Sequence, residues 1–321
     1  MIRIVIPAYN EEANIDRLLE DLAPRANALG ARVIIVDDGS ADATYDKLVS
    51  WQDKLDLRIV KHPRNLGLGT AINSGLRAAL GESTDTDAIV TIEADCTSDL
   101  DDLPRMIELY EQGFDIVLAS VYAPGGKIIG VAPHRLMMSR AVSGMFRYAG
   151  GLRDIYTLSS LYRVYRAGTL RRAAETYGYL LVREPGFAAS VELLLKLHNA
   201  GATIAEIPTI NDWNKRGGVS KLKLRPTVEA YGRLMASHLI GRIQPPPISP
   251  LAEDGGFHPQ SPPEVRYGRR AGDAVVAGSP NAPGVDALDI AAPTSPAQPG
   301  EAAPPARAAV SASAASPEAT A

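Results

Sequence analysis

Short apolar runs alternate with amphipathic segments through the first 126 residues. The apolar runs cover residues 3–6, 32–36, 57–61, 88–92 and 115–120. The segments between them repeat apolar side chains at helical spacing, over residues 11–29, 41–51, 67–80 and 103–112. Runs that are apolar at nearly every position are typical of strands covered on both faces, as in a parallel sheet. Because such strands alternate with helices, we predict βαβ units and a doubly wound, mostly parallel α/β domain.

The pattern after residue 126 is less regular. It predicts helices over residues 134–148, 187–199 and 226–243, and strands over residues 160–165 and 203–207. In the 187–199 helix, Glu192 and Lys196 lie one turn apart and are expected to form an exposed ion pair.

The last part of the chain has a different composition. Residues 245–321 contain 15 of the 24 prolines and few large apolar side chains. A segment of this composition cannot bury enough apolar surface to offset the entropy that it loses on ordering. We therefore expect one folded domain over residues 1–243 and a disordered Pro/Ala-rich tail over residues 244–321.

Charge is distributed unevenly along the chain, whose formal net charge is −4. Residues 1–126 carry 22 acidic and 11 basic side chains, whereas residues 127–172 carry nine basic side chains and one acid, Asp154. Residues 211–242 carry seven basic and two acidic side chains. An acidic half followed by a basic half fits a site that holds a metal on one side and phosphates on the other, although ordinary surface charge gives the same pattern. The basic segments lack zinc-finger spacing, and no nucleic-acid partner is expected.

Cysteine content and hydropathy indicate the compartment. The chain has one cysteine, which excludes an intrachain disulfide and a four-cysteine zinc site. No apolar run approaches the roughly 20 residues that span a bilayer. The opening run over residues 1–7 is too short for the apolar core of a signal peptide and is interpreted as a strand. These features predict a cytoplasmic protein, with any membrane contact peripheral and on the inner face of the membrane.

Polar side chains follow the first, second and fourth predicted strands. These segments read PAYNEE from residue 7, DDGS from residue 37 and EADCT from residue 93. Parallel strands end at one edge of their sheet, where doubly wound domains bind ligands. A carboxylate there can accept a hydrogen bond from a base or a ribose, and two carboxylates at i and i+2 can bind a divalent cation that bridges phosphates. Taken singly, the second segment fits equally well a turn before an N-capped helix, and the third a solvated acidic loop.

Several motifs in order resemble one family. The strings IVIPAYNEEANI, VIIVDDGSADAT, NLGLGTAINSGLRAA, GATIAEIP and RGGVSKLK follow one another within residues 1–230. They resemble the family 2 glycosyltransferases and, among these, the dolichol-phosphate mannose synthases and related polyprenyl-phosphate glycosyltransferases. The resemblance implies the GT-A fold, a Rossmann-like doubly wound sheet. It also implies a nucleotide-sugar and metal half over residues 1–126 and an acceptor half over residues 127–243.

The resemblance implies donor and metal residues in the first half. The positions that match the family's nucleotide contacts are Pro7, Tyr9, Glu11, Asp37 and Asp38. Glu93 and Asp95 match the family's Asp-x-Asp motif, which implies that both hold Mg²⁺ or Mn²⁺ at the donor diphosphate and that Glu93 contacts the donor. The loop that contains Asn65, Gly67 and Gly69 matches a segment that packs near the donor.

The resemblance implies phosphate-binding residues in the second half. Arg135 and Ser139 match an Arg-x-x-x-Ser pair that holds the acceptor phosphate. A basic loop that closes over both phosphate groups is matched by Lys215, Arg216, Ser220 and Lys221. Of these, Arg216 is expected to contact the donor, and Lys215 and Ser220 the acceptor. The expected catalytic residues are Asp95, Arg135 and Lys221.

Three positions depart from the family pattern. Glu93 replaces the usual first aspartate, which lengthens the side chain and keeps its charge. Thr97 stands where a glutamine often assists the metal, and Val121 stands where an arginine usually contacts the acceptor phosphate. Lys127 is a candidate to replace that arginine.

The resemblance implies a metal-dependent inverting glycosyltransferase that moves a hexose, with mannose from GDP-mannose as the first candidate, onto a polyprenyl or dolichyl phosphate. A phosphate acceptor is already ionised at neutral pH, so no strong general base is needed, and none of the five histidines lies in a motif. Two alternatives stay open. The same fold could act on a glycan or other hydroxyl acceptor, with Asp154 as the base, or the chain could bind a nucleotide sugar without catalysis.

Overall fold

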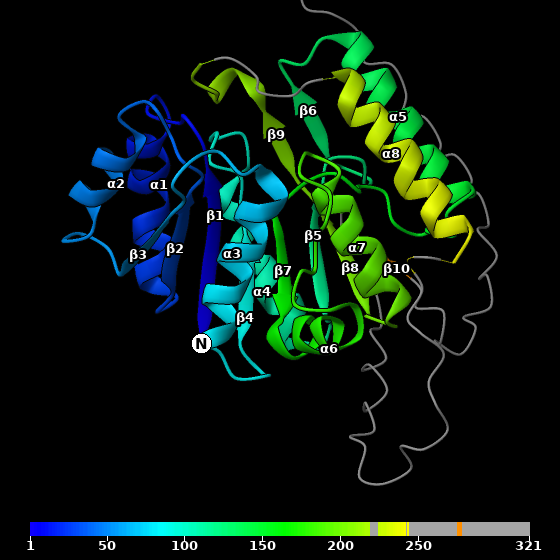
Figure 1. The fold of residues 1–321 in the computed structure, drawn as a ribbon, viewed down its shortest axis with the longest axis horizontal. Helices are drawn as coiled ribbons and strands as arrows, with labels where there is room; N and C mark the ends of the chain where they lie inside the picture. Colours follow the sequence, from blue (N-terminus) through cyan, green and yellow to red (C-terminus); the bar gives the residue numbers. More distant parts are fainter. Residues whose placement is uncertain (219–223, 242, 244–274, 278–321) are drawn as a thin grey trace, which may run out of the picture. The chain divides into compact units, whose positions relative to one another are not determined.

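The computed structural model describes residues 1–218, 224–241, 243 and 275–277. Its main feature is an eight-stranded sheet with the order β10-β8-β5-β7-β4-β1-β2-β3 (Figure 1). The strands of this sheet are β1 (Ile2–Ala8), β2 (Arg32–Asp37), β3 (Leu57–Lys61), β4 (Ala88–Thr91), β5 (Ile116–Ser120), β7 (Arg163–Arg166), β8 (Ile204–Pro208) and β10 (Val275–Ala277).

Most neighbouring strands in this sheet are parallel. β1 pairs in parallel with β2 and β4, β2 with β3, and β5 with β8. β7 lies between β4 and β5 and is antiparallel to both, and β10 is antiparallel to β8. The predicted mostly parallel α/β sheet is confirmed. The strand predicted over residues 160–165 begins later, at Arg163, and interrupts the parallel order.

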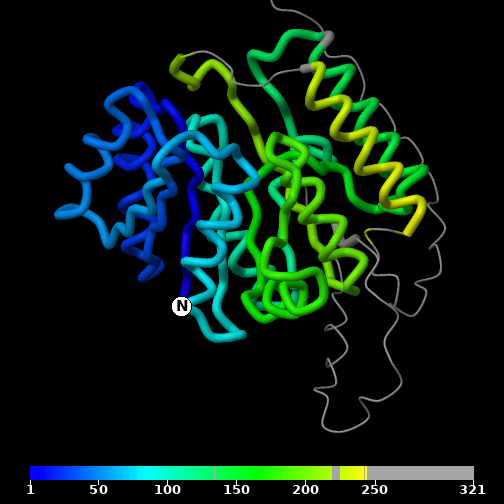
Figure 2. Tube along the Cα trace, in the orientation of Figure 1, coloured from blue at the N-terminus to red at the C-terminus, as the bar shows by residue number. Residues whose placement is uncertain are grey.

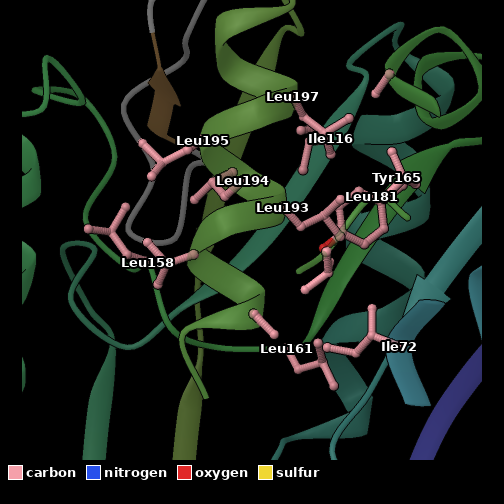
Figure 3. Close-up of a cluster of buried hydrophobic side chains, with 14 of the residues drawn as sticks. Ile72, Ile116, Leu158, Leu161, Tyr165, Leu181, Leu193, Leu194, Leu195 and Leu197 are labelled. Atoms are coloured by element: carbon pink, nitrogen blue, oxygen red, sulfur yellow. The ribbon is translucent and has the colours of Figure 1, made fainter. Parts of the chain in front are cut away.

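Helices cover both faces of the sheet. The longer helices are α1 (Ile15–Ala28), α2 (Thr44–Trp51), α3 (Leu68–Gly81), α4 (Leu103–Glu111), α5 (Pro133–Tyr148), α6 (Ala167–Tyr177), α7 (Ala189–Asn199) and α8 (Leu224–Leu239). One core joins the sheet to α1, α2 and α4. The other joins it to α3, α5, α6, α7 and α8. Figure 3 shows the part of this core around α7.

Side chains alternate between these two cores along β1, a central strand of the sheet. In β1, Val5 belongs to the core with α3 and α7, whereas Ile4 and Ile6 belong to the core with α1 and α4. Successive residues of a strand point to opposite faces, so a strand buried on both faces is apolar throughout. This arrangement accounts for the apolar runs in the sequence.

Helices α5 and α8 run alongside each other (Figure 2). The rings of Phe146 in α5 and Tyr231 in α8 meet edge to face, with their centroids 6.2 Å apart. The carbonyl of Gly150, just after α5, accepts a hydrogen bond from Nε2 of His238 at 2.8 Å. These contacts hold the two basic segments of the second half together.

Several elements were not predicted. They are the helix α6, the short strands β6 (Lys127–Ile129) and β9 (Ile210–Asp212), two single-turn 3₁₀ helices (Leu100–Asp102 and Trp213–Lys215), and β10. β6 and β9 pair in parallel as a separate two-stranded sheet. β10 falls in the segment expected to be disordered, and the rest of that segment lies outside the described residues, so the tail stays a prediction.

The pairing at the end of β1 explains why the strand can contain Pro7. The first apolar run was placed over residues 3–6, but β1 continues to Ala8, and Pro7 pairs in register with Val36 of β2. On its other side, β4 pairs only with residues up to Val5. Pro7 therefore lies beyond the end of that neighbour, where its missing N–H leaves no ladder bond unmade.

No helix in the described part of the chain is both long and apolar enough to cross a membrane.

Candidate active site

The loops after β1 and β2 are tied together at the carboxyl edge of the sheet. The backbone N–H of Asn10 donates to Oγ of Ser40 at 2.9 Å, and Oδ1 of Asn10 accepts from the N–H of Ala41 at 2.8 Å. Asn10 has a φ of 52°, in the left-handed region that asparagine tolerates better than most residues. The convergence expected from strand order is therefore observed for these two loops, and the first of them contains the half-buried Tyr9.

Asp37 and Asp38 are both buried, with exposed fractions of 0% and 3%. Asp38 accepts hydrogen bonds from Nδ1 of His62 at 2.7 Å and from the N–H groups of Leu66 and Gly67, each at 2.9 Å. Asp37 accepts from the N–H of Ser40, and its Oδ2 has no partner among the described residues. In this structure Asp38 thus fixes the loop after β3 to the end of β2.

Glycines allow two close backbone contacts beside these aspartates. Gly39 has a φ of +69°, and a Cβ there would lie 2.2 Å from the carbonyl carbon of Arg64. A Cβ on Gly69 would lie 2.0 Å from the carbonyl oxygen of Glu184. The glycines of both motifs therefore have a packing reason, because any larger side chain would force backbone segments apart.

Glu93 and Asp95 follow β4 but have different partners. Oε1 of Glu93 accepts from the N–H of Leu161 at 2.6 Å, and its Oε2 accepts from Oγ of Ser98 at 3.0 Å. Burial, and then the nearby charge of Asp95, raise the pKa of Glu93. Asp95 accepts from Oγ1 of Thr97 at 2.8 Å through Oδ1. Of the two acids, Glu93 is the one tied to the chain near β7.

The other oxygen of Asp95 contacts the basic loop. Nη1 of Arg216 lies 3.0 Å from Oδ2 of Asp95, and both side chains are mostly shielded from solvent. The guanidinium carbon of Arg216 also lies 5.5 Å from the centre of the Trp213 ring. An acid from the first half and a cation from the second half, both predicted to belong to the site, are therefore in direct contact.

Asn14 anchors the same basic loop to the start of α1. Its Oδ1 accepts from the N–H of Gly217 at 2.7 Å, and its Nδ2 donates to the Gly217 carbonyl at 3.1 Å. Nδ2 also donates to Oε2 of Glu11 at 2.5 Å. Asn14 is 1% exposed, so this double contact is shielded from water. Glu11, an expected donor residue, is thereby linked to the loop that carries Arg216.

A cavity of about 480 Å³ opens beside Glu93, between α1 and the segment after β4. Its lining includes Arg17, Glu93, Cys96, Ser98 and Lys215. Lys215 also lies close enough to Asp101 to lower the pKa of that exposed acid, after the larger effect of Arg25. The other two predicted residues of the basic loop, Ser220 and Lys221, lie outside the described residues.

The predicted acceptor residues lie on α5. Arg135 and Ser139 are both partly exposed and one helical turn apart. Val121 follows β5 directly, and Lys127 is exposed on β6. Within the described residues, the side chain of Arg135 forms no salt bridge, so its charge is available to a ligand.

Asp154, the candidate base for a hydroxyl acceptor, lies elsewhere. It is exposed, and its charge acts on His198 near the end of α7. Only a few residues separate the end of α7 from the beginning of β8. The end of α7 therefore lies near the amino edge of the sheet, where β8 begins. Asp95 follows the carboxyl end of β4, so the structure does not bring these two acids together.

Glu206 is a buried acid that the sequence analysis did not identify. It is fully buried on β8, and its two oxygens accept from the N–H groups of Tyr156 and Thr157, each at 2.9 Å. Burial raises the pKa of Glu206 to about 7, against an ordinary value of 4.5. The carboxyl group therefore fixes the chain between α5 and β7 from within the core.

The raised pKa of Glu206 predicts a pH-dependent stability. Between pH 4.5 and 7 the folded protein keeps a proton that the unfolded chain has lost, so the stabilisation is complete below pH 4.5 and is lost as the pH rises to 7. The expected amplitude is at most about 3 kcal/mol. Thermal unfolding of wild type and Glu206→Gln from pH 4.5 to 8 measures it, because the amide does not titrate. Parallel Tm curves for the two proteins would contradict the assignment.

Three further polar residues belong to the site by their contacts. They are His62, Asn14 and Asn211, which bond to Asp38, to Gly217 and to Thr97, respectively. His62 lies in none of the motifs, yet it contacts Asp38, an expected donor residue. A signal was available for His62, because it directly follows the strand over residues 57–61 beside the DDGS segment.

The oxygen donors near Asp95 fit a small divalent cation. Asp95 and Glu93 lie close enough to interact electrostatically, and Oδ1 of Asn211 is buried without a hydrogen-bond partner in the described part of the chain. Mg²⁺ and Mn²⁺ favour oxygen ligands and often bind through one or two carboxylates plus substrate phosphates. The described residues contain no cluster of three or more His, Cys, Asp or Glu side chains that would hold a metal alone. This donor set therefore suits a cation that has few protein ligands and keeps coordination positions for phosphate oxygens.

Comparison with known proteins identifies relatives. The sequence model of glycosyl transferase family 2 matches residues 3–177. The dolichol-phosphate mannosyltransferase of Pyrococcus furiosus is 27% identical over 223 residues, which are 69% of this chain and 59% of that protein. The polyprenol monophosphomannose synthase of Mycolicibacterium smegmatis is 26% identical over 246 residues, which are 75% of this chain and 88% of that protein.

A solved structure shares the fold. Glucosyl-3-phosphoglycerate synthase from Mycobacterium tuberculosis, crystallised with Mn²⁺ and UDP, has a TM-score of 0.52 and 20% identity, over 77% of this chain and 81% of that chain. This likeness confirms the expected GT-A architecture. Because the family model also covers more than half of the sequence, we conclude that the chain belongs to glycosyl transferase family 2 and is a glycosyltransferase.

Proposed function

We propose that this enzyme transfers a hexose, with mannose from GDP-mannose as the first candidate, to a polyprenyl or dolichyl phosphate with inversion at the anomeric carbon. One observation carries the proposal: Arg216 of the basic loop meets Asp95 after β4 at 3.0 Å. In this pair, an acid expected to bind the metal contacts a cation expected to bind phosphate, at one edge of the sheet. The names of the two relatives, which refer to dolichol phosphate and polyprenol, support the acceptor class.

On this proposal, residues 1–126 bind the nucleotide sugar and residues 127–243 bind the acceptor. Mg²⁺ or Mn²⁺, held by Asp95 with Glu93 nearby, would neutralise the leaving diphosphate. Arg216 leaves Asp95 and binds the diphosphate, together with Lys221 of the same loop. Pro7, Tyr9, Glu11 and the Asp37–Asp38 turn form the nucleotide side. Electrostatic stabilisation of this kind accounts for most of the catalysis expected here.

The acceptor side needs orientation more than proton transfer. A phosphate monoester has its second pKa near 6 and is ionised at neutral pH, so its oxygen attacks without a general base. Arg135 and Ser139, one turn apart on α5, hold that phosphate, with Lys215 and Ser220 completing its surroundings. Asp154 does not lie at the edge of the sheet that carries Asp95. This position agrees with a reaction that requires no general base.

Exposed apolar side chains on α5 and α8 support a peripheral membrane contact. Met137 and Tyr148 on α5 are 72% and 77% exposed, and Leu239 at the end of α8 is 60% exposed. Arg140, which is also on α5, is exposed. Apolar side chains mixed with basic ones are typical of surfaces that rest in the headgroup region of a bilayer, where the lipid phosphate lies.

The test is a transfer assay with the full chain. Radiolabelled GDP-mannose and UDP-glucose are each incubated with polyprenyl phosphate in detergent and Mn²⁺, and the lipid is extracted. We expect label in the lipid fraction from one donor, and none without polyprenyl phosphate or in excess chelator. Transfer to a free sugar or glycan alone would favour the hydroxyl-acceptor alternative. Donor binding with neither transfer nor donor hydrolysis would favour a binding protein without catalysis.

A further inference from the structure

Asn211 contacts Thr97, whose hydroxyl bonds to the acid expected to hold the metal, although Asn211 is far from both residues in the sequence. It is the central residue of β9, which pairs with β6. The N–H of Asp212 donates to the Thr97 carbonyl at 3.0 Å, and Nδ2 of Asn211 donates to Oγ1 of Thr97 at 3.3 Å. Backbone and side chain together therefore fix β9 against the segment that follows β4.

The hydrogen bonds determine which way the Asn211 amide faces. Oγ1 of Thr97 donates its one proton to Oδ1 of Asp95 at 2.8 Å. Toward Asn211 this hydroxyl can only accept, so the NH₂ group of the amide must face it. Oδ1 of Asn211 therefore points away from Thr97. It is buried and has no hydrogen-bond partner in the described residues.

A buried amide oxygen without a partner is unfavourable unless a ligand pairs with it. The groups linked to this amide are those of a hard cation site, because the Asp95 carboxylate belongs to the same hydrogen-bonded chain and interacts electrostatically with Glu93. Amide and carboxylate oxygens are preferred ligands of Mg²⁺ and Mn²⁺. A cation bound here would gain an oxygen ligand from the second half of the chain.

We propose that Asn211 is a metal ligand of this enzyme, with its Oδ1 coordinating the divalent cation that Asp95 holds. This inference rests on the metal dependence included in the proposed function. It also gives β9 a purpose beyond pairing with β6, since the strand carries a ligand to the cation and leads directly into the loop with Arg216. Metal binding would thereby connect the donor half to the basic loop.

The test measures Mn²⁺ binding, without turnover, on the full-length chain. The free Mn²⁺ signal in electron paramagnetic resonance is titrated with wild type, Asn211→Ala, Asn211→Asp and Asp95→Asn. We expect Asn211→Ala to raise the Kd for Mn²⁺ about tenfold or more. Asn211→Asp should bind Mn²⁺ at least as tightly as wild type, because it keeps an oxygen and adds a charge. Circular dichroism checks the folding of each variant, and Asn211→Ser replaces the alanine variant if that one does not fold.

The aspartate variant separates a ligand from a residue that only orients Thr97, because a carboxylate cannot donate to Oγ1 of Thr97. Equal weakening by Asn211→Ala and Asn211→Asp would overturn the proposal, and so would an unchanged Kd in Asn211→Ala. The Asp95→Asn variant identifies which statement has failed. If it binds Mn²⁺ like wild type, the metal dependence itself is wrong, whereas loss of binding in Asp95→Asn alone rejects only the role of Asn211.

Discussion

Replacing Asp95 with asparagine should lower the rate of sugar transfer by about a thousandfold or more while the fold persists. The substitution keeps the shape of the side chain and removes the charge that would hold the cation. Asp95 is in a loop and contributes little to either core, so the melting temperature should change by only a few degrees. Transfer is measured as labelled lipid, and cation binding as the free Mn²⁺ signal.

Asp95 also pairs with Arg216, so its loss could act by releasing the basic loop. The variant Arg216→Ala distinguishes the two effects. It should reduce transfer about a hundredfold, yet bind Mn²⁺ as tightly as wild type or more tightly, because a competing cation has been removed from Oδ2 of Asp95. If Arg216→Ala lost Mn²⁺ binding to the same extent as Asp95→Asn, the acid would matter through the loop and not through the metal.

Asp101→Asn is the matched control for this prediction. Asp101 lies in the same stretch of chain and also forms an ion pair, with Nη2 of Arg25 at 2.5 Å, but its side chain is 80% exposed. We expect normal transfer and normal Mn²⁺ binding from this variant. Near-normal transfer by Asp95→Asn, or full activity of wild type in excess chelator, would contradict the assignment of Asp95 to the metal.

Elements with a complete local signal could be predicted from the sequence. The strand over residues 57–61 has the same bounds in the structure, and α3 and α4 agree to within one residue at each end. In each case the apolar spacing and a following glycine or polar residue are local properties. The start of α1 was placed four residues too early, at 11 in place of Ile15. There the backbone N–H of Glu11 donates to Oγ1 of Thr44, and the side chain of Asn14 accepts from the N–H of Gly217, so both residues have partners outside a helix.

Elements whose form depends on distant partners could not be predicted. β7 is antiparallel because it fits between β4 and β5, and nothing within residues 163–166 specifies that direction. β6 and β9 have only three residues each, and their paired residues lie more than 80 positions apart in the sequence. Short partly exposed strands carry almost no periodic signal.

Glu192 and Lys196 show that the burial of a side chain also depends on distant parts of the chain. Their spacing correctly predicts an ion pair, which the structure has at 2.7 Å, but both side chains are buried and not exposed as expected. Oε2 of Glu192 also accepts from the N–H groups of Arg183 and Glu184, and Lys196 donates to the Leu181 carbonyl. These backbone partners offset the desolvation of the charges, and they come from a segment whose position the sequence does not reveal.

The candidate site divides in the same way. The acids after each strand could be found from the sequence, because parallel strands end at one edge. The contacts that orient them could not, since Asn14 reaches Gly217 across 203 positions and Asn211 reaches Thr97 across 114. Short polar loops are thus recognisable as site residues, whereas their partners are fixed only by tertiary structure.

Arg135→Ala tests the acceptor side. It should weaken the binding of the acceptor, whereas Asp95→Asn should impair the metal and donor side. Charge-assisted hydrogen bonds to a phosphate contribute enough that their loss should raise the KM for polyprenyl phosphate about 10- to 100-fold. Arg135 forms no salt bridge within the described residues, so its removal leaves no buried charge unpaired and the melting temperature should hold. GDP binding should be unchanged, because the expected donor contacts lie on other elements.

The control for this prediction is Arg172→Ala, which removes one positive charge from α6. Arg172 pairs weakly with Asp115, at 3.9 Å, just before β5 and therefore at the amino edge of the sheet. Kinetics at varied polyprenyl phosphate and fixed donor should show a raised KM for Arg135→Ala and wild-type values for Arg172→Ala. Arg135→Lys should lie between them, because it keeps the charge and loses the bidentate geometry. If Arg135→Ala weakened GDP binding instead, or changed neither constant, the acceptor phosphate would lie elsewhere, and Val121 in place of arginine would indicate a different class of acceptor.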